Sequence, residues 1–174
     1  MVADLRVQGP QAAIKRYLVS GGTAIEAGEP LHSVATLSSG VASANTYVLA
    51  AADTPVIGTH KFGGVAIEKA ELAGAGTVLE QFLTCACPVP HVGMIEGRAE
   101  TVANVDTLTE LALLVQDAVL IDYNATGASD GGQLYTIKDA AAADTSGLEI
   151  VGGNTALSTL KVTVDARAYR HDVS

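Results

Sequence analysis

The chain has 174 residues, of which 48% are hydrophobic and 17% charged, so it is long enough to bury a core and is not a disordered tail. The formal net charge of −9, with 10 scattered basic residues, argues against binding a nucleic-acid backbone, which requires clustered Lys and Arg. The chain holds no run of roughly 20 apolar residues that would span a membrane, and residues 1–19 do not resemble a secretory signal. We therefore expect a protein that is made in the cytoplasm and has neither nucleic acid nor membrane as a partner.

The first half of the chain reads as short strands separated by turns. Runs of apolar and β-branched residues, each bounded by Gly, Asn, Asp, Ser or Pro, predict strands at 15–19 and 23–36 (a pair around a turn), 46–52 and 55–62. Residues 65–76 are ambiguous, because their Glu and Lys spacing permits a helical turn or two before Gly74 and Gly76 end it.

The clearest strands lie in the second half. Apolar side chains fall at every second position through much of 113–123, which predicts a strand there. Residues 160–167 alternate better still, with Leu160, Val162, Val164 and Ala166 on one side and Lys161, Thr163, Asp165 and Arg167 on the other. A period of two over this length is typical of a half-buried strand.

These elements together predict an all-β fold, either a compact β-barrel or a β-sandwich, with at most one short helix. Turns recur about every 8–12 residues without a ten-residue helical pattern between them. No clear internal repeat is visible and no low-complexity linker divides the chain. We expect residues 1–14 to be a flexible N-terminal arm and residues 15–174 to form a single β domain.

The segment TCACPVPH concentrates the soft donor atoms of the chain at Cys85, Cys87 and His91. A structural zinc site needs four ligands, usually with two to four residues between paired cysteines, and a redox pair needs two residues between them. One residue separates these cysteines, and no pattern places a fourth ligand among His32, His60 and His171. We therefore interpret both cysteines as small buried residues on one strand face, followed by a stiff connection from Pro88 to Pro90.

Residues 122–133, DYNATGASDGGQ, nearly reproduce the ligand spacing of a calcium loop. The twelfth position is Gln133, where a bidentate Glu is required, and a polar hairpin loop explains the same residues. Ion binding by this loop stays open. The glycine-rich stretches match neither a P-loop nor a dinucleotide fingerprint, and there is no nucleophile elbow. We expect no catalytic residue, no metal and no cofactor, and hence no enzyme.

Two segments resemble a known family. Residues 27–83 run from AGEP through a small-residue stretch to the turn DTPVIG and a glycine-led strand, and residues 147–173 end the chain with GLEIVGG and LKVTVDARAYRHDV. Both resemble the small capsid decoration, or cement, proteins of tailed bacteriophages. The resemblance implies a compact β-barrel or sandwich, usually trimeric, on the outer surface of the virion capsid, where it stabilises contacts between major capsid subunits.

Partners implied by this resemblance are the major capsid protein and further copies of the chain as a homotrimer. An extended arm can pair with an exposed sheet edge through main-chain hydrogen bonds. The expected partner-binding residues are the apolar anchors of the arm and a basic C-terminal end that contacts an acidic neighbour: Leu5, Val7 and Ile14 in the arm, and Arg167, Tyr169 and Arg170 at the end.

Two other roles remain open. A β-rich tail-tube or head-completion subunit would show long alternating strands and a long loop for stacking. A carbohydrate-binding β-sandwich would display aromatic platforms, for which this chain offers no tryptophan, two phenylalanines and five tyrosines.

Overall fold

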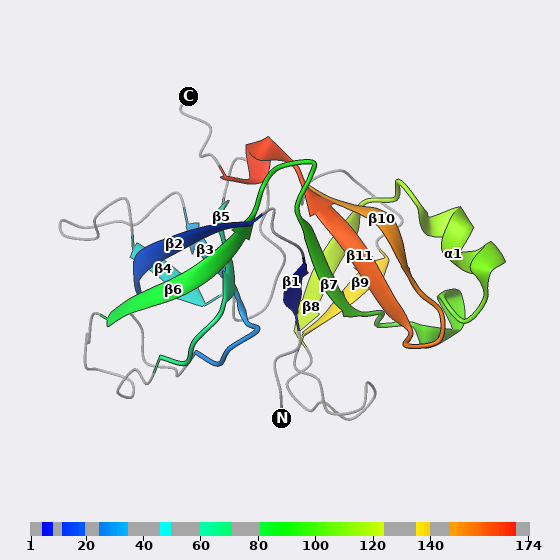
Figure 1. Cartoon of the computed structure of the whole chain (residues 1–174), viewed down its shortest axis with the longest axis horizontal. Helices are drawn as coiled ribbons and strands as arrows, with labels where there is room; N and C mark the ends of the chain where they lie inside the picture. The colour runs from blue at the N-terminus through cyan, green and yellow to red at the C-terminus, as the bar shows by residue number, and fades with distance from the viewer. Residues whose placement is uncertain are drawn as a thin grey trace.

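The computed structural model describes residues 5–8, 12–19, 25–34, 46–49, 60–70, 81–123, 135–139 and 147–169. Within these ranges the protein is mostly β, with one α-helix, which confirms the prediction of an all-β fold with at most one short helix. Figure 1 shows two lobes side by side, with β2 to β6 in one and β1, β7 to β11 and α1 in the other. We call these the N-terminal half and the C-terminal half.

The N-terminal half contains five strands whose pairing closes on itself in the order β2-β4-β3-β5-β6. β2 and β4 pair in parallel, and the other four pairs are antiparallel. The strands are β2 (Ala12–Val19), β3 (Pro30–Val34), β4 (Thr46–Leu49), β5 (His60–Ala66) and β6 (Gln81–Pro88).

The C-terminal half contains a four-stranded antiparallel sheet, in the order β1-β7-β11-β10, and the hairpin β8-β9. Two single bridges tie the hairpin to the sheet: Ala118 pairs with Glu149 of β10, and Ala99 pairs in parallel with Ile137 of β9. The strands are β1 (Arg6–Gln8), β7 (Met94–Arg98), β8 (Val119–Tyr123), β9 (Tyr135–Asp139), β10 (Leu148–Asn154) and β11 (Thr159–Val164).

The two halves repeat one strand order. Apart from β1, the same pairings recur in each half. β2 pairs with β6, β6 with β5, β5 with β3 and β3 with β4, and β4 returns in parallel to β2. In the same way β7 pairs with β11, β11 with β10 and β8 with β9, and the two single bridges supply the contact of β10 with β8 and the parallel contact of β9 with β7. β2 to β6 thus correspond, in chain order, to β7 to β11. The strand pairing thus reveals a repeat that is not clear from the sequence.

The register repeats as well. Ile14 faces Ala86 across β2 and β6, and Met94 faces Thr163 across β7 and β11. Val19, five residues after Ile14, pairs in parallel with Tyr47 of β4. Ala99, five residues after Met94, likewise pairs in parallel with Ile137 of β9. Strand pairing between remote segments sets this register, so short apolar patterns along the chain do not reveal it.

The turns that precede β3 and β8 are also equivalent. Gly28 and Gln116 both have positive φ, at 92° and 78°. The N–H of Gly28 donates to the carbonyl of Ala66, and that of Gln116 to the carbonyl of Ile150, each at 2.8 Å. A short sequence match accompanies the repeat at β4 and β9, where TYVLAAADT at 46–54 is similar to TIKDAAAADT at 136–145.

Helix α1 (Leu108–Leu114) replaces part of the strand predicted at 113–123, and that strand begins at Val119. The helix begins because Thr107 and Glu110 form a capping box, in which each side chain accepts a hydrogen bond from the other residue's N–H. Leu111 and Leu114 are buried, whereas Leu113 is exposed. The apparent alternation at 113 and 115 is therefore accidental.

The strand predicted at 160–167 is confirmed over Thr159–Val164, where Leu160, Val162 and Val164 are buried. After Val164 the chain leaves the sheet and forms the 3-10 helix η2 (Ala166–Tyr169), so the alternation at its last positions is not a strand. A second 3-10 helix, η1 (Val102–Asn104), precedes α1.

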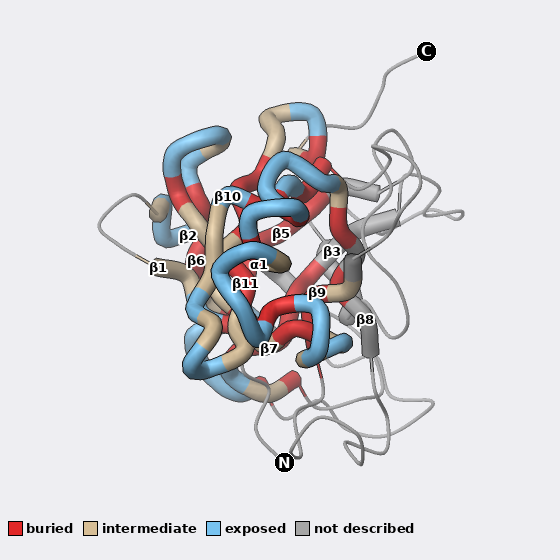
Figure 2. Tube along the Cα trace, turned by 90° about the vertical axis from the view of Figure 1, so that its right-hand side faces the viewer, coloured by how far each residue is buried: buried red, intermediate tan, exposed pale blue. Residues whose placement is uncertain are grey.

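Each half has its own hydrophobic core. The larger core fills the C-terminal half and also includes Phe62 and Val65 of β5, and the smaller one contains Ile25, Leu31, Leu83, Cys85 and Cys87 of the N-terminal half. Figure 2 shows the buried residues along the strands, with α1 exposed on this side. Tyr169 packs against both cores. That residues 15–174 fold as one unit stays a prediction.

Candidate interaction surface

Residues 5–8 of the predicted N-terminal arm pack against the fold, and the flexibility of residues 1–14 stays a prediction. Leu5 is buried in the larger core, and Val7 packs against that core from β1. Gly97 makes room for Leu5, because a Cβ atom at Gly97 would lie 2.6 Å from the Leu5 Cδ2 atom. Leu5 and Val7 thus pack within their own chain, and their binding to a partner stays a prediction.

Two of the three predicted C-terminal contact residues also have intramolecular partners. Arg167 is exposed and forms an ion pair with Asp165 at 2.9 Å, and its hydrogen bonds lower the pKa of that carboxyl group. The hydroxyl of Tyr169 donates to the carbonyl of Pro88 at 2.7 Å, and burial raises its pKa. Arg170 lies outside the described residues. These contacts tie the C-terminal segment to the fold.

Ile14, the third residue of the predicted arm, lies on the outer face of β2 with 63% of its surface exposed. Ile14, Ala86 and Val65 form one row across β2, β6 and β5. The next row contains Arg16 and Thr84, and Ile67 joins it because its N–H donates to the Thr84 carbonyl at 3.1 Å. Side chains in these rows point to the same face.

This face carries three large exposed apolar side chains. Phe82, two residues before Thr84 on β6, lies on the same face as Ile14 and Ile67, and is 57% exposed, while Ile67 is 51% exposed. The guanidinium carbon of Arg16 lies 5.4 Å from the centre of the Phe82 ring. We call the exposed group Ile14, Ile67 and Phe82 the outer apolar patch.

The equivalent face of the C-terminal half is more polar, although it includes Met94 and the exposed Val151, which follows Ile150 as Ile67 follows Ala66. Its residues at the positions of Ile14, Arg16, Phe82 and Thr84 are Met94, Glu96, Thr159 and Lys161. The carboxylate of Glu96 accepts hydrogen bonds from Thr159 Oγ1, at 2.8 Å, and from Gln8 Nε2. The same framework therefore carries a hydrogen-bonded polar face in one half and an apolar patch in the other.

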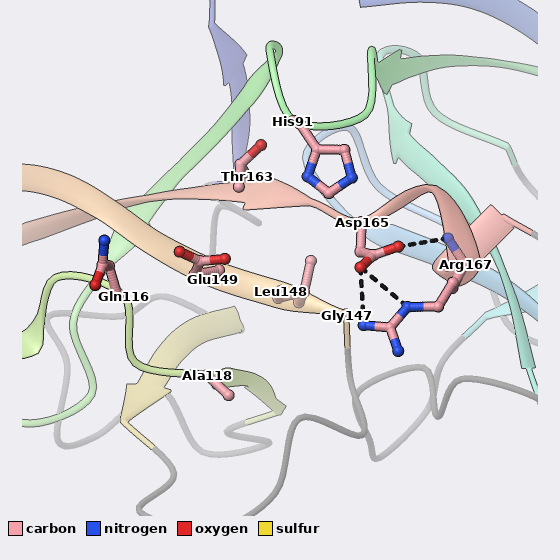
Figure 3. Close-up of a pocket in the computed structure, with 9 residues that line it drawn as sticks. All are labelled: His91, Gln116, Ala118, Gly147, Leu148, Glu149, Thr163, Asp165 and Arg167. Atoms are coloured by element: carbon pink, nitrogen blue, oxygen red, sulfur yellow. Dashed lines mark hydrogen bonds and ion pairs between the residues drawn. The ribbon is translucent and has the colours of Figure 1, made fainter.

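A polar cavity of about 310 Å³ opens on the C-terminal half. Figure 3 shows the Asp165–Arg167 pair beside His91 at one end of the lining, with Glu149 and Gln116 toward the other end. The described residues of this lining offer carboxylates, a guanidinium and an amide for hydrogen bonds, and none of them is a serine or cysteine. The cavity can hold a polar ligand, and sequence patterns missed it because its residues come from four separate segments.

Cys85 and Cys87 are buried on one face of β6, which confirms their interpretation as small core residues. In the repeat they correspond to Val162 and Val164. The Cys87 thiol donates to the Gly63 carbonyl at 3.0 Å, and burial raises the pKa of Cys85 to about 12. His91 lies on the exposed turn after β6.

Two further predicted features fall near this strand or outside the described ranges. The connection from Pro88 to Pro90 leads directly into a turn, in which the N–H groups of Val92 and Gly93 both donate to the Val89 carbonyl. Most of the possible calcium loop at 122–133 lies outside the described residues. The residues that are described contain no group of three potential metal-binding side chains.

No helix among the described residues is both long and apolar enough to span a bilayer. Comparisons of the chain with protein-family models, curated proteins and solved structures gave no match.

Proposed function

We propose that this chain is a structural decoration, or cement, protein of a tailed-phage capsid. It binds the outer surface of the head, stabilises contacts between major capsid subunits, and acts as a homotrimer without catalytic activity or cofactor. The five-stranded N-terminal half is then a small β-barrel that presents its outer apolar patch to the shell. The observation that supports this proposal is the patch itself.

The patch is best explained by a partner surface. Scattered exposed apolar residues are ordinary, but Ile14, Ile67 and Phe82 share one face, and the equivalent face of the other half is more polar, with Val151 exposed at the position of Ile67. Burying the exposed parts of these three side chains contributes about 3–5 kcal/mol. Such a gain is small for a single contact, so three linked copies would bind a shell much more tightly than one.

A second apolar surface on α1 is our candidate for contact between copies. Leu108 and Leu113 are 77% and 75% exposed at separate positions around this helix, on which Leu111 and Leu114 are buried. A helix with apolar residues outside its buried face is expected to have a further partner. We assign this surface to the homotrimer.

The test measures oligomeric state and shell binding on the same variants. Ile67→Ser with Phe82→Ser should abolish co-sedimentation with undecorated phage heads and leave the mass in solution, measured by light scattering, that of a trimer. The matched control is Val151→Ser, because Val151 follows Ile150 in β10 as Ile67 follows Ala66 and is also exposed. Unchanged co-sedimentation of the double variant, or a monomeric wild-type protein, would contradict the proposal.

The polar cavity favours a carbohydrate-binding module as a second candidate, because sugar hydroxyls are bound by carboxylate, amide and guanidinium groups such as those of Glu149, Gln116 and Arg167. Titration with oligosaccharides, followed by calorimetry, tests this role. Binding that Glu149→Gln removes would support it over the cement role. A ring much larger than a trimer in light scattering would instead support the tail-tube alternative.

A further inference from the structure

β7 and β2 hold equivalent positions, but their second edges differ. β7 pairs with β11 on one edge, and on the other with β1, which lies opposite Met94 to Glu96. β2 pairs with β6 on one edge along its whole length, and on the other with β4 at Leu18 and Val19. Among the residues that the structure describes, none pairs with 12–17 on this second edge.

The repeat identifies where a missing strand would lie. β1 pairs with Met94 to Glu96 of β7. Glu96 lies three residues before Ala99, which pairs with β9, the third strand of the repeat in this half. The equivalent stretch of β2 is Ile14 to Arg16, three residues before Val19. One half therefore shows, within the same molecule, how an added strand fits this edge.

An apolar cavity lies beside this part of β2. It has a volume of about 240 Å³ and is lined by Ala13, Lys15, Cys87, Tyr169 and the segment around Pro88. The Lys15 ammonium lies 5.5 Å from the centre of the Tyr169 ring. In the C-terminal half, Leu5 and Val7 of β1 supply apolar side chains to the core beside the equivalent edge. A strand added to β2 could place an apolar side chain in this cavity.

The charge of Arg16 indicates which residue type a strand added to β2 should place opposite it. Arg6 lies directly opposite Glu96, and Gln8 donates to the same carboxylate. The residue equivalent to Glu96 is Arg16, which reverses the charge at this position. Opposite charges across a strand pair stabilise it, and like charges destabilise it. An added strand therefore needs an acidic residue opposite Arg16.

We propose that the edge of β2 at Ile14 to Arg16 accepts an extended segment of a partner protein as an additional antiparallel strand. This segment has an acidic residue opposite Arg16 and an apolar residue opposite Ile14. Strand addition of this kind takes its affinity from main-chain hydrogen bonds and its specificity from alternate side chains. The N-terminal segment of a second copy is a poor occupant, because it would set Arg6 against Arg16.

Two synthetic peptides test the proposal on the full-length protein. One has the sequence of residues 2–9, VADLRVQG, and the other, VADLEVVG, carries Glu in place of Arg6 and Val in place of Gln8. In NMR titrations of the labelled protein, VADLEVVG should shift the amides of 12–17 and bind about tenfold more tightly than VADLRVQG. Arg16→Glu should reverse this order.

Ile67→Ser is the matched control, because it alters the outer apolar patch without changing the β2 edge, and it should leave peptide affinity unchanged. Tighter binding of VADLRVQG to the wild-type protein would overturn the proposal in favour of a second copy. So would binding of neither peptide, or shifts confined to 94–98, where the peptide would have replaced β1. The titration involves no phage heads, so its outcome is independent of the proposed shell binding.

Discussion

The hydroxyl of Tyr169 donates a hydrogen bond to the carbonyl of Pro88 across 2.7 Å and thereby joins the C-terminal segment to the last strand of the N-terminal half. The Tyr169 ring also lies against Phe62, with 5.7 Å between ring centres, and packs on both cores. This side chain thus links the two halves, alongside Phe62 and Val65 of β5, which belong to the larger core.

Tyr169→Phe should lower the free energy of unfolding by about 1 kcal/mol, because it removes one hydrogen bond and leaves the Pro88 carbonyl without that donor. Tyr169→Ala should cost more, about 3 kcal/mol, because the ring that bridges the cores is lost as well. Urea unfolding of both variants measures these changes. Equal stability of Tyr169→Phe and wild type would show that the bond contributes nothing.

Glu29 should make stability depend on pH. It is almost fully buried, and burial raises its pKa from 4.5 to about 7. Because the folded pKa is the higher one, the stability present below about pH 4.5 is lost as the pH rises through about 7.

Glu29→Gln should therefore raise stability at about pH 8 by up to about 3 kcal/mol and change it little at about pH 4. Thermal unfolding across this pH range measures the effect. Asp117→Asn is the control, because Asp117 holds the equivalent position in the C-terminal half and is exposed. A Glu29→Gln variant with the pH profile of wild type would refute this prediction.

Gly64→Ala should destabilise the protein by more than about 2 kcal/mol. Gly64 has φ of +98°, and a Cβ atom there would lie 2.6 Å from the Ala86 carbonyl oxygen and 2.8 Å from the Cys87 sulfur. Gly152→Ala is a matched control in a strand of the other half, since nothing lies within 4 Å of its added Cβ. Chemical unfolding should separate the two variants clearly, and similar losses in both would count against the argument.

The two cysteines should not react with Ellman's reagent in the native protein near pH 8. Both are buried, and the pKa of Cys85 is raised to about 12, so almost no thiolate is present there. Addition of denaturant should release two reactive thiols per chain. Fast reaction of the native protein would show that this strand opens readily or is exposed.

The sequence predicted the strands whose local pattern was complete. Leu160, Val162 and Val164 alternate with polar residues and lie in the core, and the cysteines of β6 are buried as interpreted. α1 was missed although its signal was present: Thr107 and Glu110 have capping-box spacing before LALL. Leu113 and Val115 fit a strand pattern by chance. This apparent alternation led to the prediction of a strand in spite of the capping-box spacing.

The candidate sites were harder to predict from the sequence. Among the predicted contact residues, Ile14 alone lies on the outer apolar patch, because its neighbours Ile67 and Phe82 are brought to that face by pairing across β2, β6 and β5. Leu5 and Val7 were expected to bind a partner, but the space over Gly97 and the edge of β7 accommodate them within the chain.

Composition and local alternation were enough to predict a mostly β fold and the burial of single strands, because hydrophobic periodicity is a property of neighbouring residues. The tertiary structure decided the repeat of strand order between β2–β6 and β7–β11, the outer apolar patch, and the second edge of β2, on which no described residue pairs with 12–17. Each of these depends on pairings between residues far apart in the chain, such as Ile14 with Ala86 and Ala99 with Ile137. Register across a sheet is a long-range property, and a one-residue shift would move every side chain to the opposite face.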